Sequence, residues 1–559
     1  MHLQRIKISE FKNLRNLEIM FNERFQRAEG ITGDSQLKPI RSHAVIGQNA
    51  TGKSNMIEAI ITIFRDVDLN NNASFDYELD YKIRGHEIRL VADMVKQKRP
   101  LVTINGKSSS QTYLSEHAKE YLPSHVFAYY SGKNERIEAL FQAHQKQFTR
   151  VLKHDGDNLV RRLFYCRGGH SQLVLLACLL SDDPIFAELL QNLNIVALES
   201  ALFVLKQPHT LRDLDKKDIF EGDPRFWYAR GTVVSEFLDK LWQVAWAPIE
   251  DTKEKLIDFR GRTERQKLMY LFVPNKAKLI EFGQLVGTAD RFFRYAEGAY
   301  VGDLIEEVRI TVKKREENGG DVSFSQLSEG ELQMLTVLGL MRITSEDHCL
   351  FLLDEPDTHL NPIWKLRYFD EIEKVIQHDD HKILVGDSQI IITTHDPMMI
   401  GSLRREQVRI LRNEKGQSIV NTPDEHPRGM GVAGLLKSEM FGLPSTLDLP
   451  TLNDLQRRNE LLAKKAKEGL TSEEAEELTR LRDHLDDLGF SREYRDPMYQ
   501  LFIEKMYEVR SRPLSELLSA DELKDQEKLA IKIVSELVKR ERSDELSELA
   551  KELQLKLGS

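Results

Sequence analysis

One glycine-rich segment constrains the fold of this chain more than any other feature. Residues 47–54 read Gly-Gln-Asn-Ala-Thr-Gly-Lys-Ser and match the pattern GxxxxGK[ST] in full. A short apolar run, His43–Ile46, precedes the segment, and 54–64 follow with apolar residues at helical spacing. Because backbone N–H groups converge in such a strand–loop–helix unit, it is typical of phosphate binding. The pattern predicts an α/β fold.

Each polar residue of this loop has an expected role. Lys53 is expected to reach the β- and γ-phosphates, and the Ser54 hydroxyl to bind Mg²⁺. The sequence therefore predicts ATP and Mg²⁺ as cofactors. The predicted nucleotide-binding residues of the loop are Gly47, Gln48, Asn49, Ala50, Thr51, Gly52, Lys53 and Ser54.

A second apolar run ends in two carboxylates. Residues 350–353 are Leu-Phe-Leu-Leu, and Asp354 and Glu355 follow directly. Four consecutive apolar residues are typical of a central parallel strand buried on both faces, whose carboxyl end lies where ligands bind. We expect Asp354 to hold Mg²⁺ together with Ser54, and Glu355 to polarise the attacking water.

Residues 327–333, Leu-Ser-Glu-Gly-Glu-Leu-Gln, resemble the signature motif of ABC-type ATPases. In that family the serine and the following helix N-terminus contact the γ-phosphate held by a second protomer, a favourable site for an anion. The resemblance implies a head-to-tail homodimer or a higher homo-oligomer. In it Ser328, Gly330 and Glu331 would face the partner's nucleotide.

Two further positions match the same family. His395 follows the apolar run 390–392 and Thr393-Thr394, and it resembles the switch histidine that senses the γ-phosphate. Asp357 matches the D-loop, which runs across the dimer interface. A glutamine that links Mg²⁺ to the helical lobe of the family is not placed by the sequence; Gln97, Gln142 and the segment 127–132 remain candidates.

Segments near the two ends of the chain resemble particular groups within the ABC-type ATPases. Residues 6–14 are similar to the opening strand and turn of RecF and SMC-like ATPases, which implies that Lys12 and Asn13 lie at the nucleotide. Residues 429–448, and later 495–497 with Phe502, resemble the PtuA family, the ATPases of Septu-type and retron-associated antiphage systems. That family implies an HNH nuclease partner (PtuB-like). In retron-associated systems it also implies a reverse transcriptase and its multicopy single-stranded DNA (msDNA), so nucleic acid is expected to be contacted through the complex.

Three hypotheses therefore stand. The first is an antiphage ATPase that controls a separate nuclease, in agreement with the lack of a recognisable nuclease motif in this chain. The second is a RecF-like DNA-repair ATPase that binds duplex DNA. The third treats ATP as structural, with negligible hydrolysis. The motifs identify the ATPase part, whereas the defence role rests on the resemblance.

Composition excludes other classes of protein. The net charge of −10 argues against a chain that coats nucleic acid nonspecifically. The three cysteines form no CxxC pair, and no apolar run reaches the ~18 residues of a membrane span. A cytoplasmic protein without membrane contact is the expectation.

The fold expected is an α/β, ABC-type phosphate-loop ATPase head with a mixed sheet, a mostly helical middle insertion and a helical C-terminal extension. Residues 1–130 are expected to form the N-terminal half of the head and 131–305 the insertion. The C-terminal half of the head would span 306–430 and the extension 431–559. Within the extension, Thr471 to Glu474 has capping-box form, and 514–556 read as amphipathic helices.

Overall fold

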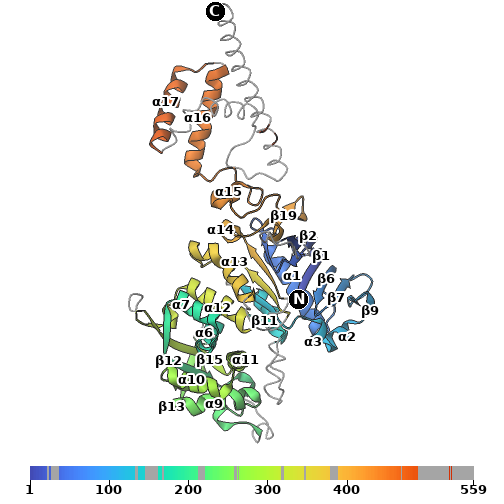
Figure 1. Ribbon diagram of the computed structural model, residues 1–559, viewed down its shortest axis with the longest axis vertical. Coiled ribbons are helices and arrows are strands. Elements are labelled where there is room, and N and C mark those ends of the chain that lie inside the picture. Colours follow the sequence, from blue (N-terminus) through green and yellow to red (C-terminus); the bar gives the residue numbers. More distant parts are fainter. Residues whose placement is uncertain are drawn as a thin grey trace, which may run out of the picture. The chain divides into compact units, whose positions relative to one another are not determined.

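The computed structural model describes residues 1–21, 24–26, 37–132, 136–144, 162–166, 169–211, 221–256, 261, 263–315, 320–344, 348–377, 388–467, 469–488, 528 and 531. Two compact units divide the chain, residues 1–428 and 429–559. The predicted α/β class with mixed sheets is confirmed by the first unit (Figure 1). None of the helices described is both long and apolar enough to cross a membrane.

A seven-stranded sheet forms the centre of the first unit. Its strands are parallel except the last, and the order is β11 (Leu163–Tyr165), β10 (Val126–Tyr130), β17 (Leu350–Asp354), β18 (Gln389–Thr394), β5 (Ser42–Ile46), β19 (Val408–Glu414) and β20 (Gln417–Asn421). Every residue of β5, β17 and β18 is buried. Burial on both faces explains why these strands are continuous apolar runs rather than alternating ones.

A second, antiparallel sheet is built almost entirely from the first 110 residues. Its order is β2 (Leu14–Met20), β1 (His2–Phe11), β6 (Tyr77–Ile83), β7 (His86–Ala92), β8 (Leu101–Ile104) and β9 (Lys107–Ser109). Helix α1 (Lys53–Asp68) shares one hydrophobic core with this sheet and with residues of β17 and β18. The phosphate-loop helix is therefore held from both sides by sheets.

The expectation of a mostly helical insertion is wrong for its middle part. Residues 195–323 contain a five-stranded antiparallel sheet in the order β13 (Trp246–Leu256), β14 (Thr263–Val273), β12 (Ile195–Lys206), β15 (Ile305–Lys314) and β16 (Asp321–Ser323). The apolar runs of β12 and β14 hide the alternation typical of strands, because the sheet buries residues on one face and half-buries them on the other.

Helices cover one face of this sheet. They include α9 (Asp239–Val244), α10 (Lys276–Val286) and α11 (Ala289–Val301), and an aromatic cluster joins them to β12 through Phe203, Phe237, Phe282 and Phe292. Near the central sheet lie α6 (His170–Leu180), α7 (Pro184–Asn192), α12 (Glu329–Ile343) and α13 (Pro362–Gln377). Helix α12 packs against α6, α7 and α13, so the insertion and the head share this helix layer.

Short elements complete the first unit. They are β3 (Arg24–Gln26), β4 (Leu37–Pro39), α2 (Gln111–Glu116), α3 (Ala118–Tyr121), α4 (Arg136–Ala139), α14 (Pro397–Ile400), a π-helical turn Val234–Leu238 and the 3₁₀ turns His209–Leu211, Pro224–Phe226, Phe324–Gln326 and Arg405–Gln407.

The second unit is helical where it is described, with α15 (Gly431–Lys437), α16 (Leu449–Lys467) and α17 (Ser472–Asp487). The capping box predicted at Thr471 is confirmed: its side chain accepts from the Glu474 amide at 3.3 Å, and the Glu474 carboxylate accepts from the Thr471 amide at 3.0 Å. The ion pair Arg457–Glu477, 2.9 Å, links α16 to α17. The helices expected at 514–556, and the segment 495–502, lie outside the described residues, apart from two isolated positions.

Candidate functional site

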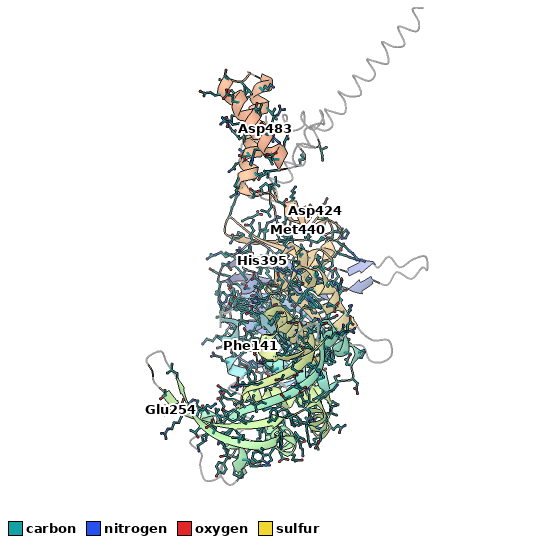
Figure 2. All side chains as sticks on the ribbon, turned by 90° about the vertical axis from the view of Figure 1, so that its left-hand side faces the viewer. Phe141, Glu254, His395, Asp424, Met440 and Asp483 are labelled. Atoms are coloured by element: carbon teal, nitrogen blue, oxygen red, sulfur yellow. The ribbon has the colours of Figure 1, made fainter. Side chains whose placement is uncertain are left out.

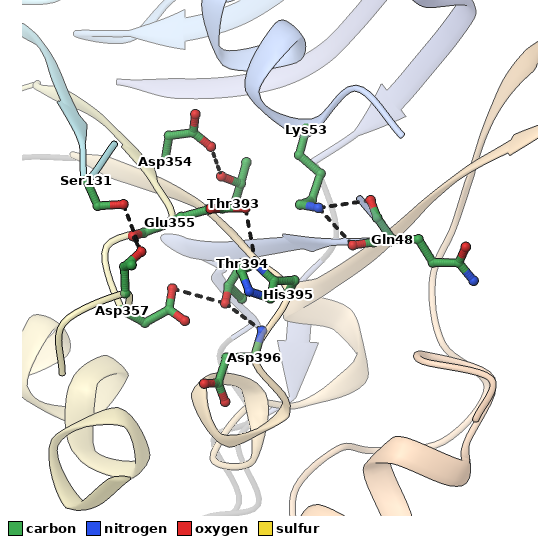
Figure 3. A network of polar contacts seen from close by, with 12 residues as sticks. Gln48, Lys53, Ser131, Asp354, Glu355, Asp357, Thr393, Thr394, His395 and Asp396 are labelled. Atoms are coloured by element: carbon green, nitrogen blue, oxygen red, sulfur yellow. Dashed lines mark hydrogen bonds and ion pairs between the residues drawn. The ribbon is translucent and has the colours of Figure 1, made fainter. Parts of the chain in front are cut away.

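Three neighbouring strands bring the predicted site residues to one edge of the central sheet. Strands β17, β18 and β5 are adjacent and parallel, with Asp354 beside Thr393 and Thr394 beside Ile46. The phosphate loop, the two carboxylates and His395 each follow one of these strand ends, at the carboxyl edge where parallel sheets bind ligands. Figure 3 shows Lys53, Asp354, Glu355 and His395 gathered around this edge.

The glycines of the phosphate loop are required by its geometry. Gly52 has φ +108°, and a Cβ atom there would lie 2.4 Å from Leu14 Cδ2. At Gly47 a Cβ atom would lie 2.3 Å from the Leu411 carbonyl oxygen. Thr51 closes the turn, because its hydroxyl donates to the Gln48 carbonyl at 2.9 Å. Only a residue without a side chain lets the backbone approach its neighbours this closely.

Lys53 lies inside the loop rather than in solvent. Its Nζ donates to the carbonyls of Gly47 at 2.8 Å and Gln48 at 3.1 Å. Burial lowers the pKa of Lys53, and the nearby carboxylates of Glu355 and Asp354 oppose that shift. The Lys53 ammonium is thus the one cation of the loop at this edge, and the carboxylates of Glu355 and Asp354 attract it.

Asp354 is completely buried, with one oxygen bonded and the other free. The Thr393 hydroxyl donates to Asp354 Oδ1, while Oδ2 has no hydrogen-bond partner. Burial raises the pKa of Asp354, opposed by the hydroxyls of Thr393 and Ser54. An orphaned carboxylate oxygen near a serine hydroxyl fits a hard cation that prefers oxygen ligands, so the donor set suits Mg²⁺.

Glu355 and His395 form a pair at the more open side of the site. His395 Nδ1 lies 3.1 Å from Glu355 Oε1, and both side chains remain partly exposed. Glu355 has φ +49°, a left-handed conformation that is uncommon outside glycine, and its amide donates to the Thr393 carbonyl at 3.0 Å. This backbone turns its side chain away from the buried strand, where a water molecule can reach it.

Asp357 is buried within its own chain. The Thr394 hydroxyl donates to Asp357 Oδ1 at 3.2 Å and accepts from the Asp396 amide at 3.0 Å. Burial raises the pKa of Asp357. The carboxylate therefore fixes the segment after Glu355 to the end of β18, and an interface role of this segment stays a prediction.

The predicted signature residues begin α12, away from the phosphate loop of the same chain. Ser328 caps the helix, accepting from the Glu331 amide at 3.2 Å, while Glu331 accepts from the Ser328 amide at 2.8 Å. Lys314 holds Glu331 through a 2.8 Å ion pair. Among the described contacts, none joins Ser328 to the loop at Lys53.

The same helix packs on the segment that follows Glu355. Gln333 is buried and donates to the Pro356 carbonyl. A Cβ atom at Gly330 would lie 2.6 Å from the His359 carbonyl oxygen, so only glycine allows this approach. Sequence reasoning missed these contacts. The buried polar position of Gln333 in an apolar helix was the available signal.

The N-terminal turn supports the phosphate loop. Asn13 Nδ2 donates to the Ala50 carbonyl at 2.7 Å, and Asn55 Nδ2 donates to Asn13 Oδ1 at 2.6 Å. Lys12 forms an ion pair with buried Glu58 of α1. Asn13 therefore contacts the phosphate loop directly, whereas Lys12 contacts α1, the helix that follows the loop.

Ser131, at the end of β10, occupies the place beside the carboxylates. Its amide donates to the Asp354 carbonyl at 3.4 Å, and its hydroxyl lies 2.8 Å from the Thr358 hydroxyl. Neither Gln97 nor Gln142 makes a described contact with the site. Of the three candidates for the missing glutamine, the segment 127–132 is the one at the site.

The chain is similar to several known proteins, and two of them are by name a Septu protein and a probable ATPase of a retron. Residues 188–400 match a family model described as an AAA domain, putative AbiEii toxin, Type IV TA system. The Septu protein PtuA of Bacillus mycoides (strain KBAB4) is 33% identical over 137 residues, which cover 24% of this chain and 18% of that protein. The retron Vc95 probable ATPase of Vibrio cholerae serotype O1 biovar El Tor is 22% identical over 130 residues, 21% of this chain and 24% of that protein.

The matched stretches thus span about a fifth of the length of these two relatives. Among solved structures, the SMC head domain from Thermotoga maritima is similar with a TM-score of 0.30 and 13% identity, covering 76% of this chain and 99% of that chain. An SmcHead bound to the C-winged helix domain of ScpA gives a TM-score of 0.30 and 12% identity, with 76% and 98% covered.

A substitution of Gly330 tests the packing of α12. In Gly330→Ala the new methyl group would push against the His359 carbonyl, so hydrogen–deuterium exchange of 356–361 is expected to rise relative to the wild type. Gly434→Ala, a helical glycine with more room, is the control and should leave that exchange unchanged. Equal exchange in Gly330→Ala and wild type would contradict the contact.

Proposed function

Taking this chain as an ABC-type ATPase similar to PtuA, we propose that it binds ATP with Mg²⁺ and hydrolyses it in a head-to-tail dimer in the cytoplasm. The ATPase controls a separately encoded HNH nuclease of the PtuB kind in antiphage defence. In a retron-associated system, a reverse transcriptase and its msDNA join the assembly, and nucleic acid is contacted through the complex.

The observation that carries the ATPase proposal is the meeting of Lys53, Asp354, Glu355 and His395 at the ends of three adjacent strands. A phosphate loop alone explains binding. A carboxylate beside a histidine, next to a buried acid suited to a metal, supplies what hydrolysis needs.

Each residue then has a part in the reaction. The loop amides and Lys53 bind the phosphates, and Asp354 with Ser54 would hold Mg²⁺, which neutralises charge developing on the transferred group. Glu355 orients the attacking water and accepts its proton, because its carboxylate is open to solvent on one side. His395, whose Nδ1 lies 3.1 Å from Glu355 Oε1, holds that carboxylate and would sense the terminal phosphate.

The position of the signature residues supports the proposed dimer. The cap at Ser328 leaves the N-terminal amides of α12 available for an anion, yet Ser328 has no described contact with its own loop. A second copy turned head to tail supplies the nucleotide that the first cannot. Each site is then built from two chains.

Mixed dimers test this arrangement. Lys53→Ala removes the loop cation and Ser328→Arg blocks the signature surface, so each variant alone is expected to be inactive. Mixing equal amounts restores one intact site in each heterodimer, and ATPase activity should recover to roughly a quarter of wild type, since half of random dimers are mixed and half of their sites are intact. If activity does not recover although heterodimers are shown to form, Lys53 and Ser328 do not act in trans.

The pH dependence of Mg²⁺ use tests Asp354. Its pKa is raised, so protons compete with the metal above the usual titration range of an aspartate, and Mg²⁺ affinity should fall as the pH is lowered. Thr393→Val removes a hydroxyl that lowers this pKa, so the midpoint should move upward. The midpoint is obtained from the Mg²⁺ concentration that half-saturates ATPase activity, measured from about pH 5 to about pH 8.

The matched control for that experiment is Thr394→Val, which removes a hydroxyl from Asp357 instead. It should leave the Mg²⁺ midpoint in place. A midpoint that moves equally in both variants would show that the shift arises from general damage to β18.

Phage challenge tests the defence role. Cells carrying the chain with its neighbouring genes should resist phage, and Glu355→Gln should abolish the resistance if turnover controls the nuclease. Folding of the variant is checked by its retained ATP binding. Intact resistance with a folded, inactive ATPase would remove hydrolysis from the mechanism. ATP-dependent binding of duplex DNA by the isolated chain, with a steep salt dependence, would favour the RecF-like alternative.

A further inference from the structure

Within the part of the chain that the structure describes, helices cover only one face of the five-stranded sheet of the insertion. Phe203, Leu205 and Leu271 point to the covered face and are fully buried. Because side chains alternate along a strand, Leu202, Val204 and the even-numbered residues of β14 point to the other face. β13 is one of the two edge strands of this sheet.

Two rows of residues cross this open face, with aromatic residues toward the β13 edge. Residues that lie opposite each other on neighbouring strands point to the same side, so the strand register defines each row. The first row is Trp246, Phe272, Leu202 and Arg309. The second row is Ile249, Tyr270, Val204 and Glu307.

The outer ends of these rows are strongly exposed. Trp246 is 69% exposed and Ile249 60%, while Phe272 and Tyr270 are half-buried beside them. Lys253, next along β13, places its ammonium 5.3 Å from the centre of the Tyr270 ring. Figure 2 labels Glu254, the next residue along this strand. A tryptophan this open among further rings and cations is unusual on a protein surface.

We propose that this face binds single-stranded nucleic acid, with bases stacked on the rings of Trp246, Phe272 and Tyr270 and phosphates held by Lys253 and Arg309. These five residues are called the aromatic strip. An open antiparallel sheet that presents rings on neighbouring strands gives unpaired bases parallel surfaces to stack on. Duplex DNA is excluded from such contacts because its bases are already stacked and paired.

The charges favour a nucleic acid over a protein partner. The centres of protein interfaces are depleted of charged residues. In the aromatic strip, by contrast, the Lys253 ammonium lies over the Tyr270 ring, and Arg309 lies in the row of Phe272 with Leu202 between them. Arg309 donates to Glu307 through Nε and Nη2, and no contact of Nη1 occurs among the described residues.

The same charges predict how the strand is held. Asp251 lies 3.9 Å from Lys253, and Glu307 pairs with Arg309, so acids partly balance the two cations. Stacking must therefore carry most of the affinity. With about two phosphates neutralised, the logarithm of the binding constant should fall with the logarithm of salt concentration with a slope of about −1.4, shallow for a nucleic-acid-binding protein.

The test uses the full chain and labelled oligonucleotides of dT and of rU, with anisotropy and tryptophan emission as the two readouts. Binding should quench the emission, because Trp246 is the exposed tryptophan stacked by a base. Trp246→Phe should abolish most of the quenching but keep binding within about threefold, and Trp246→Ala and Phe272→Ala should each weaken binding by about tenfold. Comparison of dT with rU shows which kind of single strand is preferred.

Ile280→Ala is the matched control, since Ile280 is an exposed aliphatic residue of α10 in the same lobe and on the covered side of the sheet. It should bind like wild type. Lys53→Ala should also bind like wild type, which separates this proposal from the ATPase. No binding of either oligonucleotide, a preference for duplex, or equal binding by Trp246→Ala and Ile280→Ala would overturn the proposal. Protection of Trp246 by a protein partner, without binding of oligonucleotides, would overturn it in favour of a protein interface.

Discussion

The site depends on the register between β17, β18 and β5. Because these three strands are parallel neighbours, the residues that follow them leave the sheet at one edge, and the hydroxyl of Thr393 reaches Asp354 across a single strand spacing. A shift of one residue in β18 would turn Thr393 to the other face and leave Asp354 buried without a donor. The complete burial of the strands fixes the register, since every side chain already has a packed place.

A second set of contacts ties α12 to the segment that follows Glu355 in the same chain. Gln333 binds the Pro356 carbonyl, and Gly330 lies against His359, so α12 and the segment after Glu355 pack as one body. In a head-to-tail dimer, Ser328 would touch the nucleotide of one site while Glu355 acts at the other. A movement of α12 at one nucleotide site would therefore shift the segment after Glu355 at the second site.

Much of this could be predicted from the sequence, because the chemistry depends on local patterns. The phosphate loop, the apolar strand ending at Asp354 and the cap at Ser328 are each encoded within about eight residues, and the structure places them as strand end, strand end and helix start. The insertion was harder to predict. In β12 and β14 both faces carry apolar residues, so the period of two is lost, and only pairing with distant strands shows that these runs are extended.

Contacts between remote residues were likewise beyond the sequence. Ser131 meets Thr358 across 227 positions, and neither residue type is distinctive on its own. Beside the carboxylates Ser131 contributes a backbone amide and a hydroxyl, whose spacing in the chain carries no pattern.

Strand β15 connects the sheet of the insertion to the start of α12. Near its middle, Arg309 lies on the open face of the sheet. At its end, Lys314 forms an ion pair with Glu331, whose carboxylate accepts a hydrogen bond from the amide of Ser328. Strands transmit a pull along their length with little stretch, because their backbone is already nearly extended. A force on Arg309 would therefore be transmitted over five residues to Lys314 and through Glu331 to the capped N-terminus of α12. The strand is thus a mechanical link between the sheet of the insertion and the head.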